Sequence, residues 1–325
     1  MTDYSFCRVT RKIGKILIDK NSVPPEYGTV YVDSAFPFHH NGKIMMTVLL
    51  YDGKGYQTAL FESDNYIDWK FVQIIFGRDP DKPHLRWNAA ITSILRDHQL
   101  FGPGTLKKVD GYYIAAYTSY PLPGYEAGAG RIGLARSKDL FNWEPDDGIL
   151  FPEDGEEWEQ GGLYKTCLLE INGTYYLYYN AKRKEAPNKE QTGFAVSKDL
   201  KDWTRSGNNP VINNQICGEF TNFFASDPQV FEHNGKYYCF FFGNSTVPEY
   251  RTCELVASSD DLVHWNAWEE RLITHGECGS LDDIHAHKPG ILTGPDGTLY
   301  HYYTAVNSKN ERGIALAVTD PESIK

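Results

Sequence analysis

The chain has 325 residues, of which 41% are hydrophobic, and its 32 basic and 43 acidic residues give a net charge of −11. Such a chain can bury a full core, and a single all-β domain can reach this length. The acidic balance and the lack of a long basic run exclude an electrostatic footprint for nucleic acid or for an anionic membrane. We therefore expect a small, uncharged ligand.

The sequence has no run of about 20 apolar residues, so no membrane-spanning helix is expected. The opening segment, MTDYSFCRVTRKIG, has no apolar signal core, from which we expect a cytoplasmic protein. The cysteines show no CxxC spacing, and several fall within apolar runs, which favours buried thiols over a disulfide framework. They are Cys7, Cys167, Cys217, Cys239, Cys253 and Cys278.

A short turn that ends in glycine is followed five times by an aromatic-rich segment, such as NGTYYLYYNAK or NGKYYCFFFGN. The first two turn glycines are 69 residues apart, and each later pair is 62 residues apart. The turn glycines are Gly42, Gly111, Gly173, Gly235 and Gly297. Four of the five repeats close with a related acidic segment that ends in tryptophan, at Trp69, Trp143, Trp203 and Trp265.

Asn-Gly and Asp-Gly turns supply the positive φ angles of a tight hairpin, so each repeat begins as a hairpin. Runs such as RIGLARS and TGFAVS predict further strands. A long repeat with about four strands per unit is typical of a β-propeller. We predict an all-β fold, a five-bladed β-propeller over residues 29–325, with residues 1–28 as an N-terminal arm or the closing strand of the last blade. The alternative is a β-sandwich with chance repetition.

The innermost strand of a propeller blade runs along the channel, so the residues before each hairpin are the candidate site residues. Asp33 and Asp227 stand nine and eight residues before their turn glycines, where an apolar residue is expected. Two carboxylates across a channel shift each other's pKa and can divide acid and base roles. The alternative for Asp227 is a turn-capping role before Pro228.

The other blades supply fewer carboxylates ahead of the hairpin. Blade two offers LFGPGTLKKVDG, without an acidic residue before its turn, and blade four adds Glu219 upstream of Asp227. The expected substrate-binding residues lie at a blade entrance or at the channel mouth, and they are Arg86, Trp87, Tyr164, Lys165 and Lys288. For Arg86 and Trp87, packing between blades is the alternative.

His285 and His287 in the segment DDIHAHKPG share one face of a predicted strand. A His-x-His pair can bind zinc or iron, but the barrels that use this pair need alternating helices, and no helical period appears here. A proton-transfer role is favoured because histidine titrates near neutral pH. We predict no cofactor and no catalytic metal, and a structural divalent ion in the channel stays open.

With Asp33, Asp227 and HAHKP on a five-bladed frame, the chain resembles the propeller glycosidases of glycoside hydrolase families 43, 32 and 117 from about residue 31 to residue 320. Family 43 implies a base in blade one, a second Asp in blade two and an acidic Glu in blade three. Asp33 matches the first, blade two lacks the second, and only Glu157 and Glu159 are available for the third. The likeness to family 117 is closer, since Asp33, Asp227 and His287 fill its roles.

The resemblance implies an exo-acting, inverting glycoside hydrolase that cleaves a small oligosaccharide. Asp33 is the expected base, His287 or His285 the acid, and Asp227 orients the substrate or tunes the acid, with Glu219 as a rival acid. Two alternatives stay open: a phosphorylase, in which Lys165, Arg183 or Lys288 holds phosphate, and a non-catalytic carbohydrate-binding propeller. We expect a monomer or homodimer, without a nucleic-acid or membrane partner.

Overall fold

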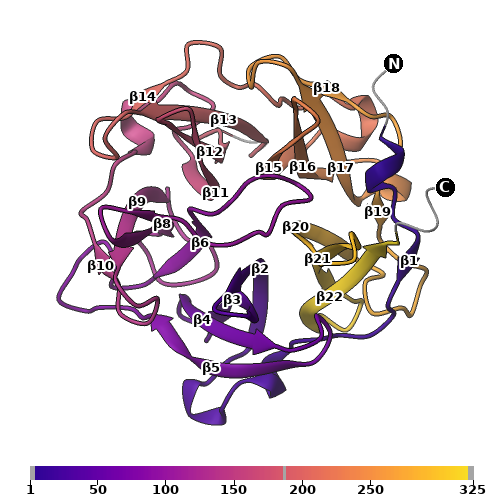
Figure 1. The fold of residues 1–325 in the computed structure, drawn as a ribbon, viewed down its shortest axis with the longest axis horizontal. Helices are drawn as coiled ribbons and strands as arrows, with labels where there is room; N and C mark the ends of the chain where they lie inside the picture. The colour runs from indigo at the N-terminus through magenta and orange to yellow at the C-terminus, as the bar shows by residue number, and fades with distance from the viewer. Residues whose placement is uncertain (1–3, 186–187, 321–325) are drawn as a thin grey trace.

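A computed structural model describes residues 4–185 and 188–320 of the chain, and Figure 1 shows its elements arranged as a ring around a central axis. Within the described residues the regular elements are β-strands and short 3-10 helices, without an α-helix. None of these described helices has the length or apolarity to traverse a bilayer. The all-β propeller predicted from the sequence repeat is confirmed.

The strands form five units of four or five strands, which we call blades one to five, and a single parallel pair between Glu190 and Phe224 joins the third and fourth of them. Blade one contains β2 (Tyr31–His40), β3 (Lys43–Tyr51), β4 (Tyr56–Ser63) and β5 (Trp69–Phe76). Blade two contains β6 (Ala90–Ile94), β7 (Lys108–Val109), β8 (Tyr112–Ser119), β9 (Arg131–Ser137) and β10 (Glu144–Pro145). Blade three contains β11 (Gly162–Ile171), β12 (Thr174–Lys182), β13 (Glu190–Ser197) and β14 (Thr204–Arg205).

Blade four contains β15 (Phe224–His233), β16 (Lys236–Asn244), β17 (Thr252–Ser259), β18 (Asn266–Ala267) and β19 (Ile273–Thr274). Blade five contains β20 (His285–Thr293), β21 (Leu299–Val306), β22 (Arg312–Thr319) and β1 (Arg11–Lys12). The 3-10 helices are η1 (Ser5–Cys7), η2 (Lys20–Ser22), η3 (Pro25–Tyr27), η4 (Pro152–Asp154), η5 (Gly218–Thr221) and η6 (Pro248–Tyr250).

Hydrophobic clusters fill the spaces between neighbouring blades. In one of them Phe231 and Phe240 of blade four pack with Ile291 and Tyr303 of blade five. Each sheet is therefore buried on both faces, which explains the nearly continuous apolar runs in its strands. No disulfide bond joins the cysteines in the described residues, as the sequence predicted; Cys7, Cys167, Cys239 and Cys253 are buried and Cys278 is exposed.

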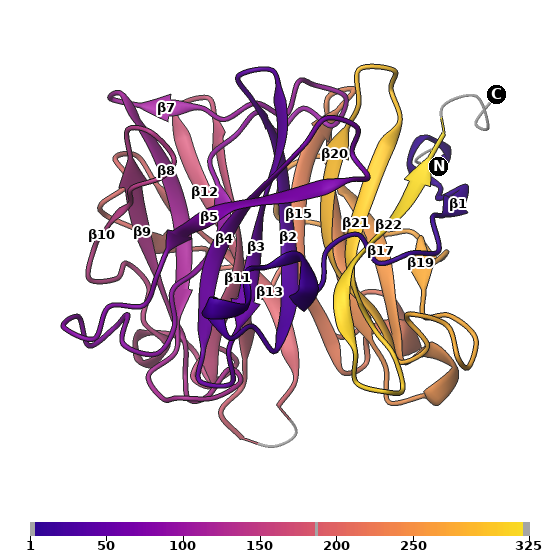
Figure 2. The same ribbon diagram turned by 90° about the horizontal axis from the view of Figure 1, so that it is seen from below.

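The N-terminal segment closes the ring. Strand β1 pairs antiparallel with β22, so that Arg11 lies opposite Val318, and Figure 2 shows β1 beside blade five. The last blade thus takes its outermost strand from the start of the chain, which holds the first and last blades together without a covalent bond. The division of the chain at residue 29 stays a prediction.

A loop at residues 95–107 of blade two, which we call the channel loop, crosses one end of the central axis (Figure 1). The Leu100 amide donates to the Glu232 carbonyl at 2.8 Å, and the His39 amide donates to the Gly104 carbonyl at 3.0 Å. The expectation that LFGPGTLKKVDG lines the entrance of blade two is therefore wrong. This segment belongs to the channel loop and β7, and the inner strand is β6, because the repeat lengthens here.

Gly290 tests the contact between blades five and one. A Cβ on Gly290 would stand 2.5 Å from the Ala35 carbonyl oxygen, which is backbone and cannot turn away. We expect Gly290→Ala to lower the free energy of unfolding by about 1–3 kcal/mol, as overpacked cores do. The control Gly207→Ala, where no atom lies within 4 Å, should leave urea denaturation unchanged. Equal midpoints for both variants would contradict this tight contact.

Candidate active site

The first strand of every blade carries a β-bulge near its entrance, where the register with the next strand shifts. The extra residue of a bulge turns its side chain away from the regular alternation. The bulge residues all line one narrow space on the axis, and they are Ser34, Thr92, Lys165, Asp227 and Lys288. The structure therefore brings together Lys165, Asp227 and Lys288, which the sequence placed at separate blade entrances.

The bulges also correct one equivalence. Asp227 has a φ of 57° and corresponds to Ser34 of blade one, whose φ is 53°. Asp33 lies one residue earlier, opposite Leu49 in the regular part of the ladder. Because successive strand residues point to opposite sides, the Asp33 and Asp227 side chains do not share an orientation.

Above the bulges lies a cavity of about 220 Å³, which we call the central cavity. Side chains from all blades except the first line it, and several carry charge. The lining residues are Tyr125, Glu126, Tyr164, Lys165, Asn180, Lys182, Glu190, Phe224, Asp227, Phe242, Asn244, His285, His287, Lys288 and Arg312.

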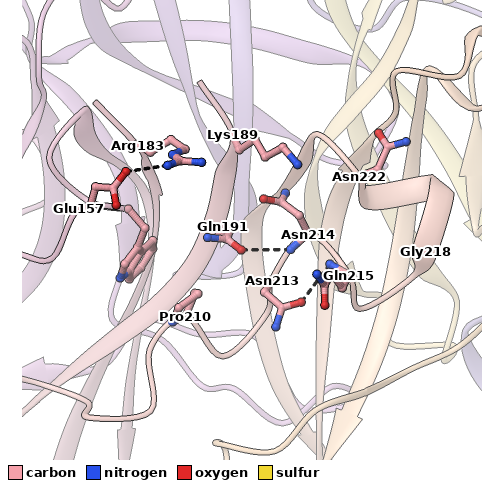
Figure 3. A pocket seen from close by; sticks show the side chains of 11 residues that line it. Glu157, Arg183, Lys189, Gln191, Pro210, Asn213, Asn214, Gln215, Gly218 and Asn222 are labelled. Atoms are coloured by element: carbon pink, nitrogen blue, oxygen red, sulfur yellow. Dashed lines mark hydrogen bonds and ion pairs between the residues drawn. The ribbon is translucent and has the colours of Figure 1, made fainter. Parts of the chain in front are cut away.

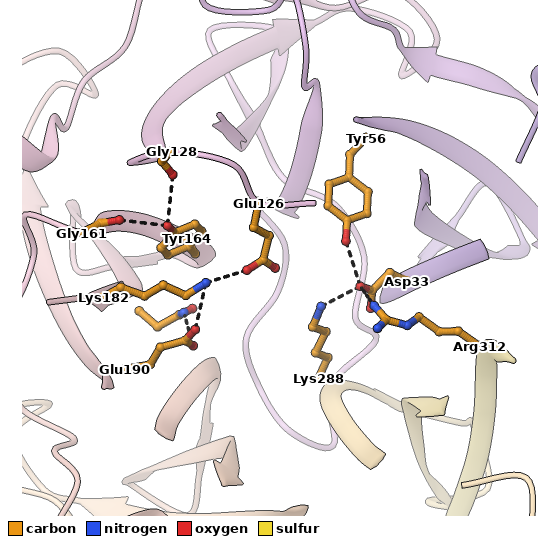
Figure 4. A network of polar contacts seen from close by, with 11 residues as sticks. Asp33, Tyr56, Glu126, Gly128, Gly161, Tyr164, Lys182, Glu190, Lys288 and Arg312 are labelled. Atoms are coloured by element: carbon orange, nitrogen blue, oxygen red, sulfur yellow. Dashed lines mark hydrogen bonds and ion pairs between the residues drawn. The ribbon is translucent and has the colours of Figure 1, made fainter. Parts of the chain in front are cut away.

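Asp33 lies behind this cavity and is completely buried. One of its carboxylate oxygens accepts hydrogen bonds from Lys288 Nζ at 2.7 Å and Arg312 Nη1 at 3.0 Å, and the other accepts from Thr304 at 3.0 Å. All three donors belong to blade five, and Tyr56 of blade one also donates to Asp33 (Figure 4). Asp33 thus ties the first blade to the last.

Charge compensation sets the ionisation of Asp33. Burial alone would raise the pKa of its carboxyl, but the ion pairs with Lys288 and Arg312 hold the pKa well below its ordinary value. A buried carboxylate that is paired with two cations and accepts four hydrogen bonds is a poor proton acceptor. The assignment of Asp33 as general base stays a prediction, and the geometry favours a structural role.

Two glutamates that the sequence analysis missed face the central cavity. Lys182 Nζ, at the end of β12, lies 2.7 Å from Glu126 Oε2 and 3.3 Å from Glu190 Oε1 (Figure 4). The Tyr164 ring covers the same ammonium at 4.3 Å, and Asn180 Nδ2 donates to Glu190 Oε2 at 3.0 Å. One lysine therefore fixes two carboxylates beside each other.

The two glutamates differ in their tendency to hold a proton. Burial would raise the pKa of Glu126, yet Lys182 and Lys288 lower it below its ordinary value. Burial raises the pKa of Glu190. The positive charge of Lys182 lowers this pKa, but the negative charge of Glu126 offsets part of that effect. The backbone of Glu126 has a φ of 44°, a conformation that residues other than glycine adopt rarely and at some cost in energy.

Lys165 and Asp227 face the same cavity, and neither side chain makes a hydrogen bond or ion pair with a described residue. Burial raises the pKa of Asp227, and burial together with the nearby Lys288 lowers the pKa of Lys165. These opposite shifts bring the two groups toward titration near neutral pH. Because neither Lys165 nor Asp227 has a hydrogen-bond or ion-pair partner among the described residues, both side chains are available to a ligand.

Both histidines line the central cavity, with ring centroids 5.3 Å apart. His287 Nδ1 lies 3.0 Å from the Thr304 carbonyl, so we assign its proton to Nδ1, and Nε2 accepts. Burial lowers the pKa of His285 to about 4 and that of His287 well below its ordinary value. Neutral imidazoles are poor proton donors, so the role of either histidine as general acid stays a prediction. In the described residues no group of three or more metal-ligating side chains could hold a metal ion.

The remaining sequence candidates lie away from the central cavity. Glu219 is exposed on η5, Arg86 is exposed, and Trp87 is half-buried, and none of them lines this cavity. Glu159 is buried and accepts from Arg205 Nε at 2.9 Å, and Glu157 pairs with an arginine outside the cavity. The structure therefore does not place any of these five residues in the central cavity with Asp227.

The residues that were missed had weak sequence signals. Glu126 lies in the glycine- and proline-rich segment YPLPGYEAGAG, which reads as a surface loop, and Glu190 begins an ordinary strand. The one available signal was the charge of Lys182 at the end of an otherwise aromatic strand. A buried lysine needs a carboxylate partner, but its identity depends on neighbouring blades.

Comparisons with known proteins agree with this architecture. Residues 99–311 match the family model described as "Glycosyl hydrolases family 32 N-terminal domain". Two solved structures, a "BT0996 RGII" complex and a "Glycoside hydrolase", superpose with TM-scores of 0.85 and 0.84. They share 28% and 26% identity, and each alignment covers 98% of this chain and 94% of the other.

A curated relative is the "1,2-beta-oligomannan phosphorylase" of Thermoanaerobacter sp. (strain X514). It is 30% identical over 127 residues, which make up 37% of this chain and 41% of that protein. The matched part thus spans about two fifths of the curated relative, which leaves the activity of the whole relative outside this comparison.

Asp33→Asn tests the structural role of this carboxylate. Removing one partner of a buried ion pair leaves Lys288 and Arg312 uncompensated, so we expect the free energy of unfolding to fall by about 3–5 kcal/mol. The control is Asp64→Asn, which removes an exposed pair with Lys43 and should shift urea denaturation far less. Unchanged stability together with lost turnover would instead support Asp33 as the general base.

Glu254 gives a test of pH dependence. It is completely buried, and neither carboxylate oxygen has a partner in the described residues. Burial raises its pKa well above the ordinary value, so the folded protein retains a proton that the unfolded chain releases above about pH 4.3. Stability is therefore lost as the pH rises from there through the folded-state pKa.

We expect Glu254→Gln to be more stable than the parent at pH 7 and to lose this advantage below about pH 4.3. Thermal unfolding across pH 4–8 measures the difference, with the exposed Glu26→Gln as the control. A constant difference at all pH values would show that Glu254 does not change its protonation on unfolding.

Proposed function

The chain belongs to the glycosyl hydrolases family 32 N-terminal domain family, and we propose that it removes the terminal sugar of a small oligosaccharide with Glu126 and Glu190 as catalytic carboxylates. The resemblance to propeller glycosidases found in the sequence is confirmed by this membership. The closer likeness to family 117, the cytoplasmic location and the monomeric or homodimeric state stay predictions.

The observation that carries the proposal is the pair of glutamates held by Lys182. Hydrolysis of a glycosidic bond uses one ionised carboxylate and one that carries a proton. Glu126 has a lowered pKa and Glu190 a raised pKa, and both face the same cavity. Opposite shifts in neighbouring carboxyls are what acid and base assignments require.

The spacing of the pair supports a double-displacement mechanism. The two carboxylate oxygens bound to Lys182 can lie no further apart than about 6 Å, which is below the separation of about 6.5–9.5 Å in inverting enzymes and compatible with about 5–5.5 Å in retaining enzymes. Glu126 would attack the anomeric carbon while Glu190 protonates the departing oxygen. Glu190 would then take a proton from the water that releases the sugar. This assignment replaces the inverting mechanism expected from the sequence.

The size and lining of the central cavity support a terminal sugar. A volume of about 220 Å³, bounded by the bulge residues, suits one sugar ring better than a chain. Its lining holds basic and acidic side chains side by side, since Lys165, Lys182, Lys288 and Arg312 face Glu126, Glu190, Asp227 and the buried Asp33. The Tyr125 side chain, 47% exposed next to Glu126, offers a ring for stacking on a sugar.

Paired substitutions test the catalytic roles. We expect Glu126→Gln to lose turnover by at least about 100-fold on every substrate, because the nucleophile is removed. Glu190→Gln should lose as much on substrates with a poor leaving group and much less on activated aryl glycosides, which depart without protonation. Proton NMR of the first product should show a retained anomeric configuration.

The matched control is Glu219→Gln, an exposed glutamate that does not line the cavity, which should keep full turnover. Inverted product, or loss in Glu219→Gln with full activity in Glu126→Gln, would refute the assignment. If aryl glycosides bind without turnover, the protein is a carbohydrate-binding propeller instead.

A phosphorylase is the second candidate, and one observation favours it. The Lys165 ammonium faces the cavity without a hydrogen bond or ion pair to a described residue, so it is available to an anion, and the curated relative is named as a phosphorylase. Phosphate would then replace water as the group that accepts the sugar. Cleavage that depends strictly on added phosphate, and that falls in Lys165→Met, would select this candidate.

A further inference from the structure

A second cavity, of about 620 Å³, opens between blades three and four (Figure 3). The segment from the end of β12 to the start of β13 forms one side, and residues 206–223, which precede β15, form the other. Its lining residues are Glu157, Trp158, Arg183, Lys189, Gln191, Pro210, Asn213, Asn214, Gln215, Gly218 and Asn222. None of these residues lines the central cavity.

The two cavities share a wall, which is the start of β13. Glu190 faces the central cavity, and its chain neighbours Lys189 and Gln191 line the second cavity. The side chain of Asn214, which is 8% exposed, donates from Nδ2 to the backbone carbonyl of Glu190 at 2.8 Å. The backbone N–H of Asn214 donates to Gln191 Oε1 at 3.2 Å. A residue that lines the second cavity is therefore hydrogen-bonded to the backbone of Glu190, the proposed acid.

The proposed acid decides which side of the substrate is the leaving-group side. The group that leaves is protonated by the acid, so it must lie against Glu190 when the bond breaks. The second cavity is built on that same segment of chain, and it is almost three times the volume of the central cavity. The second cavity is therefore the larger space beside the segment that carries the proposed acid.

The lining of the second cavity suits an anionic sugar. Arg183 and Lys189 outnumber the single carboxylate, Glu157, which accepts from Arg183 Nη2 at 2.6 Å. The Lys189 ammonium makes no hydrogen bond or ion pair with a described residue, and Figure 3 shows it extending beside the amide side chains. Trp158 is only 9% exposed, so recognition rests on polar groups and not on ring stacking.

We infer that the second cavity binds a carboxylate-bearing sugar residue on the leaving-group side of the substrate. The carboxylate is held by Lys189 and the outer face of Arg183, while the amides of Asn213, Gln215 and Asn222 bind hydroxyl groups. The inference rests on the proposed function for its placement beside Glu190. It goes beyond that function because it names a second sugar unit of the substrate and the charge that this unit carries.

A pair of glycosides that differ only at the carboxylate tests the inference without turnover. Methyl β-D-glucuronide and methyl β-D-glucoside are titrated against the intact protein by calorimetry at low salt. We expect the glucuronide to bind at least about 10-fold more tightly, a preference that falls as salt screens the lysine. Equal affinities for the two glycosides would overturn the inference.

Lys189→Met localises the effect, because it keeps the aliphatic stem and removes the charge. We expect the preference for the glucuronide to fall to within about twofold, with the affinity for the glucoside unchanged. Lys184→Met, an exposed lysine outside the cavity lining, is the matched control and should retain the full preference. A preference that survives in Lys189→Met, or disappears in Lys184→Met, places the carboxylate elsewhere and refutes the assignment.

Thermal unfolding verifies that each variant is folded, and Lys189→Gln serves as a second variant if the methionine destabilises the protein. The binding measurement is separate from catalysis. Failure of the aryl glycoside assay on the parent protein refutes the proposed hydrolase, whereas a lost charge preference with normal turnover refutes only the second site.

Discussion

A β-bulge at the same point in the first strand of every blade is the constraint on which the site depends. Regular strands would send alternate side chains into the two spaces between blades, where charge is costly. The bulge turns one residue per blade toward the axis, and three of the five are Lys165, Asp227 and Lys288. The blades thus pack through apolar side chains while their bulge residues form a polar channel. The channel lies on the axis because the bulge occurs at the same point in each of the five blades.

Charged groups in the channel divide into two kinds. Asp33 accepts from three donors of blade five and so joins the first and last blades where they meet. Lys165 and Asp227 are buried without a described partner, an arrangement that costs stability and is retained where function needs it. The glutamates at Lys182 lie between these extremes, because one cation serves two carboxylates. Stability and chemistry therefore use adjacent residues of the same channel.

The wall between the two cavities links recognition to catalysis. Asn214 donates from Nδ2 to the backbone carbonyls of Glu190 and Phe223, so residues 206–223 are fixed to the strand that carries the proposed acid. Binding energy from a remote part of a substrate can in this way be used at the reacting bond. The two cavities share no lining residue, so the proposed sugar units are recognised by separate sets of side chains.

The sequence by itself determined the architecture, because hairpin turns and aromatic strands are local patterns and their 62-residue spacing repeats. It also located Lys165 and Asp227, since each stands at a fixed distance from its own turn. Only the tertiary structure decided that Asp33 pairs with residues more than 250 positions away, that burial lowers the pKa of both histidines, and that Glu126 and Glu190 meet at one lysine. Burial and charge pairing between blades depend on contacts distant in the chain, and no local pattern records them.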